Sequence, residues 1–313
     1  MGFLKEIKKI RNKDILEEKI KSKFKNLKNE LEEGPSKKEL IEEQREKIKE
    51  VLERTKHKKE VLSKDWVKTG IKGFDELLEK GIPRGTSVLV AGGAGSGKTI
   101  FLLQVMNNVA LSGEKCLYIS LEESEARLKQ HMHNFNLEPE KLEKKGLIKI
   151  KRVDPFEIAR DVEAMLSAAK GELKMNLVEL GEIIPKDFKP KWVFIDSLTA
   201  LAAAFRDDTD NYRIYIEQLF RYFEKIGVTS FLVSETEEIP TKFSKTGVEE
   251  FLADAVIVLY HIKRGDIREN AIEILKLRGA KHQKKIVAMQ ILDGKGIVIY
   301  PEQEVFGGVD GEK

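Results

Sequence analysis

The sequence contains almost no cysteine, no long apolar run and little net charge. Its single cysteine, Cys116, excludes a disulfide framework, fits a reducing compartment, and stands inside an apolar run where we expect a core residue. No apolar stretch approaches the about 18 residues of a membrane-spanning helix, and the first ten residues lack the apolar segment of a secretory signal. The formal net charge of +3 is too small to indicate nucleic-acid binding by itself. We therefore expect a cytoplasmic protein with no membrane span.

Charge of both signs is abundant, by contrast. Charged residues make up 35% of the 313 residues, and lysine and glutamate dominate among them. This bias is typical of proteins from hyperthermophiles. Residues 1–60 contain 19 basic and 14 acidic residues, so the basic excess of the chain lies in this first part. The length suffices for one large domain and a smaller part.

Residues 1–64 carry the pattern of two amphipathic helices. Apolar residues recur at helical spacing, at Leu16, Ile20, Phe24, Leu27 and Leu31. Gly34 and Pro35 end this pattern, and Ser36 with Glu39 forms a capping box that begins a second helix. We expect a helical hairpin or short coiled coil that packs on the main domain, on its own copy or on a partner. A basic arm for nucleic acid is the less favoured alternative, because the charges are mixed and aromatic residues are scarce.

Residues 65–306 alternate short apolar runs with amphipathic stretches. Five runs predict buried parallel strands, namely TSVLVAG (86–92), CLYIS (116–120), LIKIK (147–151), WVFIDS (192–197) and TSFLVSE (229–235). This rhythm indicates an α/β domain with a mostly parallel sheet. Four closely spaced runs between residues 255 and 302 predict antiparallel hairpins at its end. Residues 170–190 read as an inserted helix and loop, and residues 307–313 as a disordered tail.

A glycine-rich loop follows the first of these strands. It matches the P-loop pattern G-x-x-x-x-G-K-[ST] in full, as Gly92, Gly93, Ala94, Gly95, Ser96, Gly97, Lys98 and Thr99. The glycines allow backbone N–H groups to surround a polyphosphate at the start of a helix. Lys98 is expected on the β- and γ-phosphates and Thr99 on Mg²⁺. The sequence therefore predicts a site for ATP and Mg²⁺.

Carboxylates end two further strands of the predicted sheet. Asp196 closes the run WVFID, where a P-loop protein is expected to hold Mg²⁺ together with Thr99. Glu122 and Glu123 follow the run CLYIS. Acids at this point could simply favour the start of the next helix. Because the ends of parallel strands meet at one edge, we instead expect a catalytic role, with Glu123 activating water and Glu122 as its partner.

The chain resembles the KaiC-like branch of the RecA superfamily of ATPases over residues 67–306. The stretches TGIKGFDELLEKGIPRGTSVLVAGGAGSGKTIFLLQ, YISLEESEARL, FIDSLTAL, GVEEFLADAVIVL and ILKLRGAKH carry the resemblance. It implies a RecA-like core with a single ATPase repeat that assembles into a ring, expected to be a hexamer, with ATP between neighbours. Where one repeat of the family carries a phosphorylated Ser-Thr pair, this chain has Glu250 and Phe251. We therefore expect an ATPase without autokinase activity.

The resemblance also gives a role to the segment KLRGAKH. It implies that Lys276 and Arg278 reach the γ-phosphate in the neighbouring subunit and stabilise charge there, as an arginine finger does. It implies that His282 contacts the same nucleotide. Without the resemblance, these residues would read as a solvated turn. An unknown protein partner is expected at residues 1–64 or 170–190, which lie outside the resemblance.

Three further local patterns do not predict a metal or nucleic-acid site. His131 and His133 point to different faces of a helix, so a metal site is not expected. Residues 206–211, RDDTDN, lack the glycine and terminal glutamate of a calcium loop. Residues 234–240 are acidic and would disfavour nucleic acid if they faced a channel.

The sequence is compatible with three functions. The first is an ATPase whose turnover drives or times a conformational or signalling change in a ring. The second is a DNA-binding RadA-like recombination or repair paralogue, and the basic, glycine-rich channel loops that would indicate it are not visible. The third is a regulator that binds ATP and barely hydrolyses it, which the intact Glu122 and Glu123 argue against.

Overall fold

The computed structural model describes residues 66–168, 183–206, 208–237, 240, 242–264 and 266–305. The predicted helical arm at 1–64, the tail at 307–313 and most of the segment 170–190 lie outside these residues. Within the described residues, no helix is long and apolar enough to cross a membrane.

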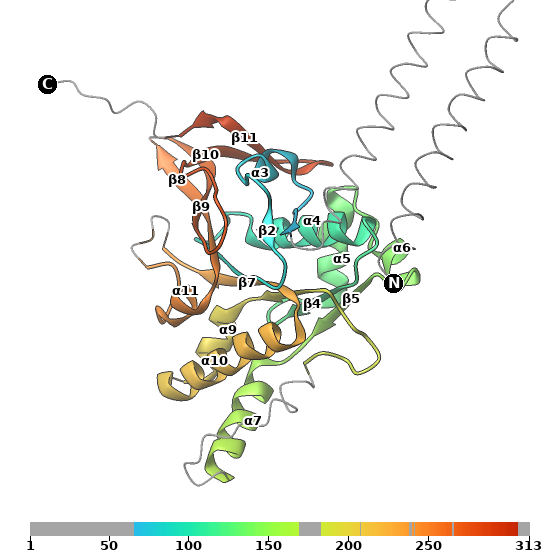
Figure 1. Ribbon diagram of the computed structural model, residues 1–313, viewed down its shortest axis with the longest axis vertical. Helices are drawn as coiled ribbons and strands as arrows, with labels where there is room; N and C mark the ends of the chain where they lie inside the picture. Colours follow the sequence, from blue (N-terminus) through green and yellow to red (C-terminus); the bar gives the residue numbers. More distant parts are fainter. Residues whose placement is uncertain are drawn as a thin grey trace, which may run out of the picture. The chain divides into compact units, whose positions relative to one another are not determined.

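A nine-stranded sheet forms the centre of the described domain (Figure 1). Its order is β11 (Gly296–Glu304), β10 (Val287–Leu292), β9 (Ile267–Leu277), β8 (Ala255–Arg264), β3 (Ser87–Gly92), β7 (Thr229–Glu235), β6 (Trp192–Asp196), β4 (Cys116–Ser120) and β5 (Ile148–Arg152). The six strands from β8 to β5 are parallel, and β9, β10 and β11 continue the sheet in antiparallel pairs. The predicted α/β fold with a mostly parallel sheet and antiparallel hairpins at its end is confirmed.

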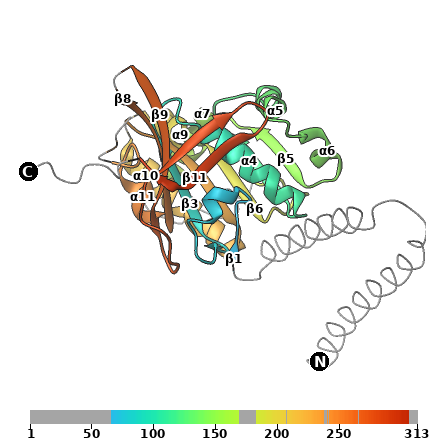
Figure 2. The ribbon, with the colours of Figure 1, turned by 90° about the horizontal axis from the view of Figure 1, so that it is seen from above.

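Helices cover both faces of this sheet. On one face lie α3 (Lys72–Asp75), α4 (Lys98–Leu111), α5 (Glu125–Asn134) and α6 (Pro139–Lys144). On the other lie α7 (Pro155–Ala168), α9 (Leu198–Ala204) and α10 (Thr209–Ile226). Figures 1 and 2 show α4 and α10 on opposite sides of the strands. Two short elements remain, the pair β1 (Trp66–Val67) with β2 (Ile82–Pro83) and the helix α11 (Val248–Leu252).

The strands follow the rule for a sheet that is covered on both faces. Every residue of β3, β4 and β6 is buried, so these strands read as continuous apolar runs rather than as an alternation. Cys116 is a buried free thiol in β4, as predicted. The helix α10 shows the complementary pattern, with buried residues at helical spacing, an Asp208 side chain that accepts from the N–H of Asn211, and Gly227 in the left-handed conformation at its end.

The hairpin of β10 and β11 packs against the elements that carry the glycine-rich loop. The Gln104 side chain on α4 bonds both the N–H and the carbonyl of Ile297, at 2.7 and 3.2 Å. In α3, Gly73 approaches the backbone of β11 so closely that a Cβ there would lie 2.1 Å from the Ile299 carbonyl oxygen. Glycine is therefore required at position 73 because a side chain would clash with β11, and not because of the backbone angles there.

We predict that Gly73→Ala lowers the free energy of unfolding by about 1–3 kcal/mol, because the added methyl group must displace β11. Chemical denaturation of the full chain measures this. The control is Lys72→Ala, an exposed position in the same helix, which should stay within about 0.5 kcal/mol of the unchanged protein. Equal stability of the two variants would contradict the close contact.

Candidate functional site

The glycine-rich loop joins β3 to α4. Gly95 and Gly97 have positive φ values of 76° and 93°, and Gly97 is the N-cap of α4 without any side-chain cap. A Cβ at Gly92 would lie 2.5 Å from the Leu259 carbonyl oxygen, so that position also excludes a side chain. The buried Ser96 hydroxyl has no hydrogen-bond partner. This uncapped helix start, wrapped by glycine backbone, fits an anionic phosphate group.

Lys98 is held inside the loop. Its Nζ donates to the Gly93 carbonyl oxygen at 2.9 Å and lies 3.9 Å from Oε1 of Glu235. Burial lowers the pKa of Lys98, while the carboxylates of Glu235, Asp196 and Glu122 oppose that shift, in decreasing order of effect. The Lys98 ammonium group therefore lies within the loop that would surround a bound phosphate.

Thr99 and Asp196 lie together, although 97 positions separate them in the chain. Thr99 Oγ1 donates to Oδ2 of Asp196 at 2.7 Å, and the buried Tyr118 hydroxyl donates to the same oxygen at 2.8 Å. Burial raises the pKa of Asp196, and these two hydrogen bonds counteract the rise. A hydroxyl beside a carboxylate fits Mg²⁺. The described residues contain no cluster of three or more acids, histidines or cysteines suited to a metal, so phosphate and water would supply its other ligands.

Glu122 and Glu123 point in different directions. Glu122 accepts a hydrogen bond from the hydroxyl of Ser197, the residue after Asp196. The Glu123 carboxylate instead contacts Arg127 Nε at 2.9 Å and His131 Nε2 at 3.0 Å, both on α5. Glu122, and not Glu123, is therefore the glutamate that is bonded next to Asp196. The Glu123 backbone N–H bonds Ser120 Oγ at the end of β4, and this turn directs the side chain along the helix.

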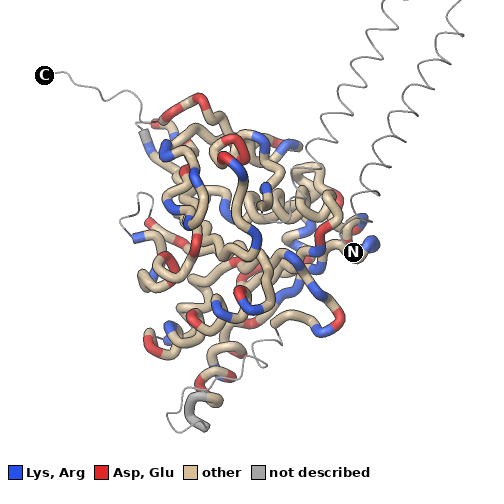
Figure 3. The backbone as a smooth tube through the Cα atoms, viewed as in Figure 1, with Lys and Arg blue, Asp and Glu red and all other residues tan. Residues whose placement is uncertain are grey.

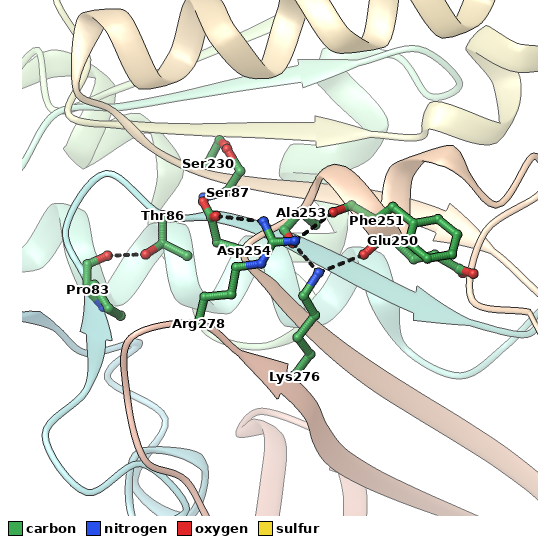
Figure 4. Close-up of polar contacts among 10 residues, drawn as sticks. All are labelled: Pro83, Thr86, Ser87, Ser230, Glu250, Phe251, Ala253, Asp254, Lys276 and Arg278. Carbon is green, nitrogen blue, oxygen red and sulfur yellow. Dashed lines mark hydrogen bonds and ion pairs between the residues drawn. The ribbon is translucent and has the colours of Figure 1, made fainter.

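Lys276 and Arg278 lie near Ser87 (Figure 4), where β3 begins, whereas the glycine-rich loop follows the other end of that strand. Arg278 N–H donates to the Asp254 carbonyl, and Asp254 N–H donates to that of Ser87, where β3 begins. Gly92 lies at the other end of that strand, about 16 Å away at the usual rise per residue. The structure thus does not bring these cations to the phosphate loop of their own chain.

Both cations are tied to the end of α11. Lys276 Nζ donates to the carbonyls of Glu250 and Ala253 at 3.0 and 2.7 Å. Arg278 donates to the Phe251 carbonyl at 3.0 Å and pairs with Asp254 at 3.5 Å. Figure 4 shows the two side chains side by side at this helix end, where cations are favoured by the exposed carbonyl groups.

The remaining histidines of the sequence analysis have separate surroundings. His282 forms an isolated bridge with Leu78, and neither of its buried ring nitrogens has a hydrogen-bond partner. His131 contacts Glu123, as described above, whereas His133 Nε2 lies 3.1 Å from Glu140.

The sequence analysis does not predict several residues that the structure places near the loop. Tyr118 and Ser197 orient Asp196 and Glu122, and nothing in their spacing indicates this. In the sequence, Glu235 belongs to the acidic stretch 234–240. It also ends a predicted strand, and this same signal, an acid at a strand end, predicts Asp196 as a site residue and would have predicted Glu235 as well.

The fold and the loop together define a P-loop ATPase domain of the RecA superfamily. Residues 67–304 match the family described as "ATPase: KaiC", and the chain belongs to this family. It is 32% identical over 236 residues to the circadian clock protein KaiC3 of Synechocystis sp. (strain ATCC 27184 / PCC 6803 / Kazusa), covering 75% of this chain and 45% of that protein. It is 31% identical over 237 residues to the circadian clock oscillator protein KaiC of Thermosynechococcus vestitus, covering 75% and 44%.

A solved structure agrees with this assignment. The crystal structure of a KaiC-like protein from the hyperthermophilic archaeon Pyrococcus horikoshii OT3 matches with a TM-score of 0.61 and 32% identity, over 75% of this chain and 99% of that one. The chain spans less than half the length of the two clock proteins named above. Family membership supports nucleotide binding.

We predict that Tyr118→Phe lowers the free energy of unfolding by about 1.5–3 kcal/mol, because the buried Asp196 carboxylate loses a donor. Chemical denaturation without nucleotide measures this. The matched control is Tyr215→Phe, since the Tyr215 hydroxyl is buried without a partner and its removal should be neutral or stabilising. A Tyr118 variant as stable as the control would contradict the role of this hydrogen bond.

Proposed function

We propose that this protein is a Mg²⁺-dependent ATPase that works as a ring. The observation that carries the proposal is the meeting of three strand ends: Lys98 after β3, Asp196 after β6 and Glu122 after β4. In a parallel sheet these ends lie at the edge where ligands bind. Each residue type suits one task of phosphoryl transfer.

The chemistry follows from this placement. Residues 92–99 surround the phosphates, and Lys98 turns from the Gly93 carbonyl to the β- and γ-phosphate oxygens. Thr99 and Asp196 would hold Mg²⁺, which neutralises phosphate charge when bound. Glu122 accepts a proton from water as the water oxygen bonds to the γ-phosphorus. The bond from that phosphorus to the β,γ-bridging oxygen breaks, and ADP leaves with its electron pair.

Lys276 and Arg278 complete the neighbour's site in this proposal, and the family resemblance implies that His282 contacts the same nucleotide. Location supports the roles of Lys276 and Arg278. Both lie at the far end of β3 from their own loop, and Arg278 bonds the carbonyl of Phe251, a residue that is 74% exposed. An exposed aromatic side chain beside fixed cations suits an interface. The end of α11 positions both cations before a neighbour arrives.

The two alternatives have less support. In the view of Figure 3, basic and acidic residues are interspersed over the described part of the chain, whereas DNA binding favours a basic face. A regulator with little hydrolysis would not need Glu122 held beside Asp196. Binding of a protein partner through residues 1–64 or 170–190 stays a prediction, since residues 1–65 and 169–182 lie outside the described part.

The first test separates the two glutamates. We predict that Glu122→Gln lowers Mg²⁺-dependent ATP hydrolysis by about 10²- to 10⁴-fold, because the water loses its base. Glu123→Gln should retain most activity, since its carboxylate faces Arg127 and His131. Phosphate release and nucleotide binding are measured on the same samples, and binding should persist in both variants. The opposite order of effects would restore Glu123 as the base, and no hydrolysis by the unchanged protein would favour the regulator.

The second test addresses the shared site. We predict that Lys98→Ala and Arg278→Ala subunits are each inactive alone and regain hydrolysis when assembled together. A junction between an intact loop and an intact cation arises in about a quarter of random pairings of an equimolar mixture, so a comparable fraction of activity is expected. The control mixes Arg278→Ala with the Lys98→Ala, Arg278→Ala double variant, which offers no complete junction. Inactive mixtures in which mass measurement shows co-assembly would overturn the role in trans.

A further inference from the structure

Glu235 is an acid beside the phosphate loop that the proposed mechanism does not use. It ends β7 and pairs in register with Gly92, the first residue of the loop. The Glu235 N–H donates to Thr199 Oγ1 at 2.8 Å, and the next N–H, of Thr236, donates to the Gly92 carbonyl at 3.1 Å. The backbone of Glu235 is thus held from α9, which follows Asp196, and from the loop itself.

The Glu235 carboxylate faces the buried cation. Its Oε1 lies 3.9 Å from Lys98 Nζ, and the two side chains are 48% and 9% exposed. Two other carboxylates influence Lys98, but each has a hydrogen-bond donor of its own. Asp196 accepts from Thr99 and Tyr118, and Glu122 accepts from Ser197. Among the described residues, Lys98 is the one charged or hydrogen-bonding partner of the Glu235 carboxylate.

Nucleotide must therefore compete for Lys98. A bound polyphosphate brings several negative charges to the ammonium group, which then leaves both the Gly93 carbonyl and Glu235. The hydrogen bonds of residues 235 and 236 keep the Glu235 backbone beside the loop, so its half-exposed carboxylate stays within electrostatic range of the phosphates after it loses its cation. The Glu235 carboxylate and the phosphates carry like charge and repel one another, and the repulsion grows with the number of phosphoryl groups.

We infer that Glu235 is a competing counter-ion for Lys98 that weakens nucleotide binding, and weakens ATP binding more than ADP binding. The inference rests on the proposed function only in requiring that polyphosphate binds at residues 92–99. It assigns an affinity-determining role to a residue outside the P-loop, the Mg²⁺ pair and the catalytic glutamate. Before nucleotide binds, Glu235 helps to hold the Lys98 side chain in the loop. After nucleotide binds, repulsion from Glu235 favours nucleotide release.

The experiment compares Glu235→Gln with Glu237→Gln in the full chain. Glu237 is an exposed acid two residues further along, so this control removes the same charge without touching Lys98. Binding of Mg²⁺-ADP and of a Mg²⁺-bound non-hydrolysable ATP analogue is measured by calorimetry at low and high salt. We predict that Glu235→Gln binds the analogue roughly 3- to 10-fold more tightly, with a smaller gain for ADP and a gain that shrinks as salt screens the half-exposed carboxylate.

The outcomes separate this inference from the proposed function. A tighter, salt-dependent affinity in Glu235→Gln alone supports the inference, because structural damage would weaken binding instead. Unchanged or weaker binding by Glu235→Gln, with normal binding by the unchanged protein, overturns the inference and leaves the ATPase proposal intact. An equal gain in Glu237→Gln also overturns it, since the effect would then reflect net charge. Absence of nucleotide binding by the unchanged protein would overturn the proposed function itself.

Discussion

The parallel register of four adjacent strands is the constraint on which the candidate site depends. Gly92 on β3 is level with Glu235 on β7, and Ser120 on β4 is level with Asp196 on β6. Because side chains in such a sheet alternate between faces, a slip of one residue in any pair would turn its terminal acid away from the loop. The buried apolar runs fix this register, since a slip would also move the apolar side chains of each strand out of their packed positions. The same strand register therefore determines both the packing of the core and the positions of the site residues.

Aromatic packing extends this constraint to the acids themselves. Tyr118, Phe194 and Trp192 stack in sequence on one face of the sheet, with ring centroids 6.2 and 6.3 Å apart. The stack fixes the Tyr118 ring, and its hydroxyl fixes Asp196. The result is a carboxylate that is oriented before any ligand arrives. Burial raises its pKa, the Tyr118 hydrogen bond counteracts that rise, and a bound cation would lower the pKa further. Phosphoryl transfer depends on groups that are positioned before the reaction in this way.

The sequence predicted those features that depend on backbone pattern. The loop at 92–99, the buried strands, Asp196 and the antiparallel end of the sheet all have local signals in residue type and spacing. Side-chain direction had no such signal. Glu122 and Glu123 are identical neighbours, and their difference comes from the turn at Ser120, from Ser197 at the N-cap of α9, and from two α5 residues. Likewise, nothing local shows that Lys276 and Arg278 bond the end of α11, because that contact joins segments about 25 residues apart.

The strand β3 connects the glycine-rich loop with the backbone that holds Arg278. At one end it carries the phosphate loop, and at the other Ser87 exchanges backbone and side-chain hydrogen bonds with Asp254, which holds Arg278. All six residues of β3 are buried, so close packing keeps its length and position fixed. Such a strand keeps the residues at its two ends at a fixed separation and does not itself move. Any response to nucleotide must therefore begin in groups that can change partners, and Lys98, with its two replaceable contacts to Gly93 and Glu235, is such a group.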